Sequence, residues 1–158
     1  MRKTIGKVML GIITAAMMAA CQAAEFFRFE YESRGAPWEV GYHLTIDFDN
    51  RVLITQTTMR CEEYRQPDGY CPRQKTKKII SLRPEEITEL QKMLNSAGVI
   101  RWKDKYENRR GVCDGTFWDA SYVLKDGTSR KIKGDNNWPR GIKELSAALE
   151  KMGFLFIQ

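Results

Sequence analysis

The chain has 158 residues, of which 26 are basic and 20 are acidic, so its formal net charge is +6. Three of the basic residues lie in the first seven positions, and the remaining 23 leave a net charge of only +3 against the 20 acidic residues. A balance this mild does not by itself argue for nucleic-acid binding, and none is predicted. The length suits one ordinary domain with a workable core.

The first twenty residues have the pattern of a secretory signal peptide. Arg2, Lys3 and Lys7 form a basic head without acidic residues, and residues 8–20 are apolar or small. A helix of this apolar run would be about 20 Å long, which is shorter than the roughly 30 Å hydrocarbon core of a bilayer. We therefore expect a cleaved leader at 1–20. A buried N-terminal helix is the alternative, but the run has no polar face.

The sequence MAAC, residues 18–21, resembles the lipobox of bacterial lipoproteins, in which a large aliphatic residue, any residue and a small residue precede an obligatory cysteine. Met18 stands where leucine is usual. The resemblance implies cleavage before Cys21, diacylglycerol on its sulfur and an acylated N-terminus. In enteric members of the family, aspartate after the cysteine favours the inner membrane, so Gln22 implies the outer membrane, facing the periplasm. Ordinary cleavage after Ala23 is the alternative and would release a soluble periplasmic protein.

The mature chain should then consist of a lipidated N-terminus and short tether at 21–24 and a single globular domain at 25–158. An exported chain meets an oxidising compartment, so its other cysteines should pair. Cys61 and Cys71 bracket the turn signal Pro-Asp-Gly, and we expect a disulfide between them. Pairing of Cys113 with either one stays open, because connectivity cannot be read from a sequence.

The first part of the domain alternates apolar and polar residues, as strands with one buried face do. In the first such segment Phe27, Phe29 and Tyr31 share the apolar face. In the second, His43 lies on the polar face. The strands expected from this pattern and from β-branched residues span 25–33, 39–48, 51–59 and 75–82.

The chain then changes to a helical period. Residues 84–97 begin with a proline suited to a first helical turn, repeat apolar residues at helical spacing and end before Gly98. The turn signal Asp-Gly at 126–127 predicts a hairpin of 117–125 and 128–134. A second amphipathic helix should begin near Pro139 and end at Gly153. Residues 154–158 suit a short strand or a packed tail.

The predicted order is therefore four strands, a helix, two strands and a helix. Tight turns favour a mostly antiparallel sheet of about six strands, and the two amphipathic helices should pack on its apolar face. This is an α+β fold.

The residues with catalytic potential form no recognisable motif. His43 is the single histidine and should be a solvated strand residue, since no motif supplies it with a nucleophile. Cys113 is better explained by a disulfide or burial than by nucleophilic reactivity. Asp47 and Asp49 lack the further oxygen ligands of a calcium loop, and the cysteine spacings do not fit zinc. No cofactor or metal site is predicted.

The stretches DGTFW, 114–118, and GDNNWP, 134–139, are the most distinctive of the chain. Together with the hairpin between them they resemble a region of small bacterial envelope proteins with no known activity. Physically, Trp118 and Trp138 should pack the hairpin against the last helix. A role in binding a partner at the surface is the alternative.

Basic residues gather between positions 73 and 83. They could be a solvated edge, where lysine discourages strand pairing, or a surface for an anionic partner such as lipid head groups or wall polymer. The residues are Arg73, Lys75, Lys77, Lys78 and Arg83.

These features favour a non-enzymatic lipoprotein of the cell envelope, with a lipid-anchored domain that binds a partner or supports envelope structure. A secreted inhibitor or immunity protein that blocks an enzyme is the second hypothesis. A hydrolase using His43 or a carboxylate is the third, and it requires a concave pocket in which His43 lies beside a nucleophile or a carboxylate.

Overall fold

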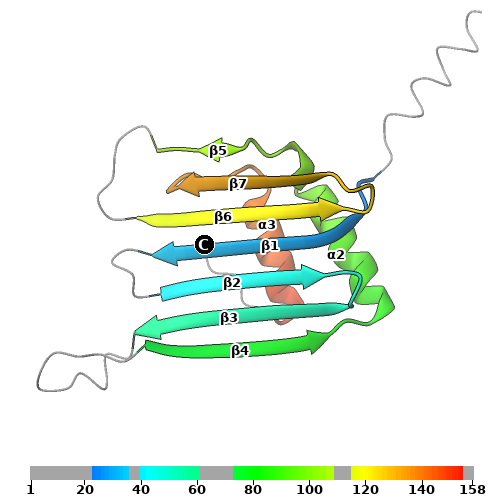
Figure 1. Ribbon diagram of the computed structural model, residues 1–158, viewed down its shortest axis with the longest axis horizontal. Coiled ribbons are helices and arrows are strands. Elements are labelled where there is room, and N and C mark those ends of the chain that lie inside the picture. Colours follow the sequence, from blue (N-terminus) through cyan, green and yellow to red (C-terminus); the bar gives the residue numbers. More distant parts are fainter. Residues whose placement is uncertain (1–22, 36–39, 61–72, 109–114, 155–158) are drawn as a thin grey trace, which may run out of the picture.

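The structure, a computed structural model, describes residues 23–35, 40–60, 73–108 and 115–154. Within these ranges seven strands form one mixed sheet, and two α-helices lie behind it (Figure 1). The strand order is β4-β3-β2-β1-β6-β7-β5, and all neighbours are antiparallel except β5 and β7. The predicted α+β class is confirmed. The strands are β1 Phe26–Gly35, β2 Val40–Asp47, β3 Val52–Arg60, β4 Arg73–Ser81, β5 Lys105–Tyr106, β6 Thr116–Leu124 and β7 Ser129–Asp135.

Helix α2 has the ends that the sequence indicates, and helix α3 begins at Ile142, after Pro139. Helix α2 spans Pro84–Ser96, and the carboxylate of Glu86 accepts hydrogen bonds from the backbone N–H of Arg83 at 2.8 Å and from its guanidinium at 2.9 Å. These bonds lower the pKa of Glu86. Gly98 follows with a φ of 68°, which ends the helix. Helix α3 spans Ile142–Lys151.

Strand β1 departs from the predicted alternation. We expected Phe27 on the buried face with Phe29 and Tyr31, but Phe27 is 38% exposed. The pairing of β1 with β6 shifts register between Phe26 and Arg28, and Phe26 takes the buried place instead. Such a bulge moves every residue before it to the other face, so strict alternation mispredicts that part of the strand.

The sheet has seven strands in the described ranges, where the sequence predicts about six. Strand β5 lies in the charged segment that follows the short 3-10 helix η3, Val99–Arg101, and its two residues pair in parallel with β7. Two residues are too few to show any periodicity. The edge of the sheet beside β7 is therefore covered by a strand that the sequence pattern does not reveal.

The core lies between the sheet and the helices, and Trp118 is among its largest fully buried side chains. Trp118 is 1% exposed and stacks on Tyr31, with 6.2 Å between the ring centroids. The rings of Trp102 and Tyr106 lie 6.5 and 5.7 Å away, and the indole N–H donates to the carbonyl of Asn137 at 2.9 Å. Through this cluster of aromatic rings, η3 and β5 pack against the central strands.

In the ranges that the structure describes, neither helix combines the length and apolar character needed to cross a bilayer.

Candidate functional site on the open face

Both helices of the described chain lie on one face of the sheet, and the opposite face has no helix over it (Figure 1). We call this the open face. Because side chains alternate along a strand, the residues between the core positions point to it. Strand pairing aligns six of them in one row from β4 to β7: Lys77, Gln56, His43, Glu32, Asp119 and Lys133.

The centre of the open face is hollowed. A cavity of about 270 Å³ lies over β2, β1, β6 and β7. Within it, the Ser121 hydroxyl donates a hydrogen bond of 3.2 Å to the carboxylate of Glu30. A second hollow adjoins it and shares Glu30, Ser121 and Lys131 with it. The polar side chains that line the first hollow are Glu30, Glu32, His43, Asp119, Ser121 and Lys131.

The charges of the open face are arranged in bands. Two acidic side chains of β1 pair with arginines of the same strand, Arg28 with Glu30 at 2.6 Å and Arg34 with Glu32 at 2.9 Å. Asp119 on β6 forms no ion pair within the described ranges. Lysines flank these central carboxylates and their paired arginines on both sides, over a width of about 24 Å between β4 and β7. These lysines are Lys75, Lys77, Lys131 and Lys133.

His43 lies half-buried in the hollow, on the polar side of β2 where alternation places it. Its Nε2 is 3.4 Å from the Thr45 hydroxyl. Glu32 is its cross-strand neighbour on β1, so the hollow brings a histidine and a carboxylate together. The Ser121 hydroxyl lines the same hollow, but its hydrogen bond goes to Glu30. Chemically the hollow offers carboxylates, a hydroxyl, an imidazole and the ammonium group of Lys131 to a polar group.

The structure places the predicted binding residues in different surroundings. Arg73 begins β4 at the edge of the sheet, and Lys75 and Lys77 are exposed on the open face. Trp118 is in the core, beyond the reach of a partner, and Trp138 is partly buried against the same core.

Two buried tyrosines lie under the hollow region. Burial raises the pKa of Tyr31 to about 12, and burial together with the neighbouring phenol of Tyr31 also raises the pKa of Tyr42. Both hydroxyls therefore stay neutral and contribute no charge to the site at physiological pH.

The predicted lipidation site Cys21 and the cysteines Cys61, Cys71 and Cys113 lie outside the described residues. The disulfide stays a prediction with a direct measurement. Peptide mapping of the oxidised mature protein without reductant should recover Cys61 joined to Cys71 in one fragment. Recovery of both as free thiols, or of Cys113 joined to either, would contradict the pairing.

The residues that line the hollow were not singled out by sequence reasoning, apart from His43. Alternation could have placed each on a polar strand face, but not beside the others. In the described part of the chain, no three His, Cys, Asp or Glu side chains are placed to hold a metal ion. Comparison of the whole chain with models of protein families gives no match, and comparison with curated proteins gives none either.

Proposed function

We propose that this protein is a non-enzymatic lipoprotein of the bacterial cell envelope whose open face binds a partner protein. The leader pattern and the lipobox resemblance ending at Cys21 support the anchor. The observation that carries the binding function is the banded charge of the open face, with a hollow of carboxylates between two rows of exposed lysines.

The bands also indicate what the partner must present. Lys75 and Lys77 on one side and Lys131 and Lys133 on the other attract acidic side chains. The hollow, where Asp119 has no ion pair in the described chain, accepts a lysine or arginine. A uniformly anionic polymer would meet Asp119, the central carboxylate that has no ion pair in the described chain, and would be repelled there. A folded protein can place acidic side chains opposite both lysine rows and a basic side chain opposite the hollow. An acidic protein surface with a central basic residue therefore fits best.

The two other hypotheses give different expectations. An inhibitor would be the same domain without the lipid, and its N-terminus would begin at Ala24. The hydrolase hypothesis gains one observation, because Glu32 is the neighbour of His43 inside a hollow. That hypothesis requires that His43→Gln abolish a hydrolytic activity of the purified protein, whereas a binding function requires no such activity.

Charge reversal tests the binding function. A photo-crosslinking residue at Ser121 should give a discrete protein adduct in intact cells, because this position faces the hollow. In the Lys77→Glu/Lys131→Glu background, the adduct yield should fall on the order of tenfold, since both lysine rows lose an attractive charge and gain a repulsive one.

The matched control is Lys143→Glu/Lys151→Glu. It changes the net charge by the same amount on exposed positions of α3, away from the open face, and should leave the adduct intact. An equal loss in both variants would show an effect of net charge alone. An adduct that contains carbohydrate polymer and no protein would contradict the proposed partner.

A further inference from the structure

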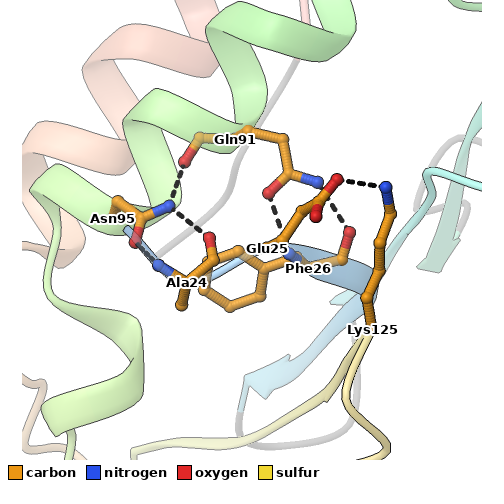
Figure 2. A network of polar contacts seen from close by, with 6 residues as sticks. All are labelled: Ala24, Glu25, Phe26, Gln91, Asn95 and Lys125. Carbon is orange, nitrogen blue, oxygen red and sulfur yellow. Dashed lines mark hydrogen bonds and ion pairs between the residues drawn. The ribbon is translucent and has the colours of Figure 1, made fainter. Parts of the chain in front are cut away.

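Two amide side chains of α2 hold the first described residues of the domain (Figure 2). Asn95 accepts a hydrogen bond from the N–H of Ala24 at 2.8 Å and donates one to the carbonyl of Ala24 at 2.7 Å. Gln91 makes the same pair of bonds with Phe26, at 2.9 and 2.6 Å. Each amide satisfies both backbone groups of one residue, as a neighbouring strand would. We call Gln91 and Asn95 the α2 clamp.

The clamp is possible because the spacing of residues along the helix matches their spacing along the strand. Residues four apart on a helix rise by about 6 Å, and residues two apart on a strand are about 6.6 Å apart. Gln91 and Asn95 therefore align with Phe26 and Ala24 along the chain. Glu25, between them, forms an ion pair with Lys125 (Figure 2), and its backbone carbonyl accepts a hydrogen bond from the backbone N–H of Lys125 at 2.9 Å. The segment 24–26 is thus held from two sides.

The fixed segment lies close to the proposed anchor. Cys21 is three residues before Ala24, and three residues span at most about 11 Å even when fully extended. We infer that the α2 clamp orients the domain on the lipid surface, with the end of the sheet where β1 begins facing the bilayer. This inference rests on the lipid anchor proposed above.

The surface at that end suits a lipid interface. Phe27, beside the clamped segment, is 38% exposed. An exposed aromatic ring is a side chain that lies favourably among lipid head groups. Phe117 is also exposed, at 45%, but it pairs with Arg34 at the other end of β1, about 23 Å away. With the end of the sheet toward the bilayer, the open face does not itself face the lipid, and an envelope partner can reach it.

The two exposed phenylalanines give a matched test. The full acylated protein is reconstituted into vesicles of phosphatidylethanolamine and phosphatidylglycerol, with a photo-crosslinking phenylalanine analogue at Phe27 or at Phe117. Lipid adducts should be several-fold more abundant from Phe27. Equal labelling from both positions, or more from Phe117, would overturn the orientation.

Two variants test the clamp itself. Gln91→Leu/Asn95→Leu removes its hydrogen bonds, and Thr88→Leu is the control on an exposed position of the same helix. The clamp variant, checked for folding by circular dichroism, should lose most of the difference between Phe27 and Phe117, and the control should keep it. An unchanged difference in the folded clamp variant would contradict the inference.

A longer tether gives the same test without touching the fold. A flexible linker of roughly ten residues inserted after Gln22 adds about 17 Å of reach, and it should also remove the difference. Persistence of the difference would mean that the surface, and not the clamped tether, sets the orientation. The mass of the N-terminal peptide is measured in each sample. A missing acyl group would contradict the lipid anchor itself. An acylated protein without the labelling difference would contradict only the orientation.

Discussion

Trp118→Ala is expected to lower the free energy of unfolding by about 3–5 kcal/mol, the range for removing a large buried aromatic side chain. The indole contacts rings from β1, β5 and the segment after η3. Its loss leaves a cavity, because these three elements would all have to move to fill the space. Because domains of this size are stable by only about 5–15 kcal/mol, this is a large share. Urea unfolding followed by circular dichroism measures it.

Gly134 supplies the control for this prediction. It is the cross-strand partner of Trp118 on β7, and a Cβ placed there would lie 2.3 Å from the indole. Gly134→Ala should therefore destabilise the native protein, because the buried ring must shift. In the Trp118→Ala background most of this cost should disappear, since the clashing ring is gone. The same cost in both backgrounds would show that the alanine meets something other than the indole.

Much of the fold follows from local patterns. The helix at Pro84, the hairpin at Asp126 and the polar side of β2 are each fixed by residues close in the chain, and the structure has all three. The errors occur where pattern fails. A bulge before Arg28 interrupts a period of two, and β5 is too short to have one.

The candidate site could not be assembled from the sequence. Alternation indicates which strand residues share the polar face. The hollow also requires that β1 lie between β2 and β6, and alternation within one strand does not give this order of strands. Glu30 and Ser121 are 91 residues apart and yet share a hydrogen bond. The α2 clamp depends likewise on a contact over 71 residues, between Ala24 and Asn95. Two amides on a helix give no sign of this in the sequence.

Cys21→Ala is expected to move nearly all of the mature protein from the membrane fraction to the soluble periplasmic fraction. In the proposed lipoprotein the acyl chains on Cys21 supply the attachment, at about 0.8 kcal/mol for each buried CH₂ group, and the variant has no sulfur to carry diacylglycerol. Small residues around this position still allow ordinary leader cleavage. Fractionation with N-terminal peptide mass spectrometry measures both the location and the processing.

Gln22→Asp is the matched control, because it keeps the cysteine. It should remain membrane-bound, and by the resemblance to enteric lipoproteins it should move from the outer to the inner membrane. Full retention of a correctly cleaved Cys21→Ala protein would mean that another part of the chain binds the membrane. A wild-type N-terminus beginning at Ala24 without lipid would refute the anchor, and the Asn95 carbonyl would then accept its hydrogen bond from a free amino terminus. In that case the open face would serve a diffusing protein, as the inhibitor hypothesis requires.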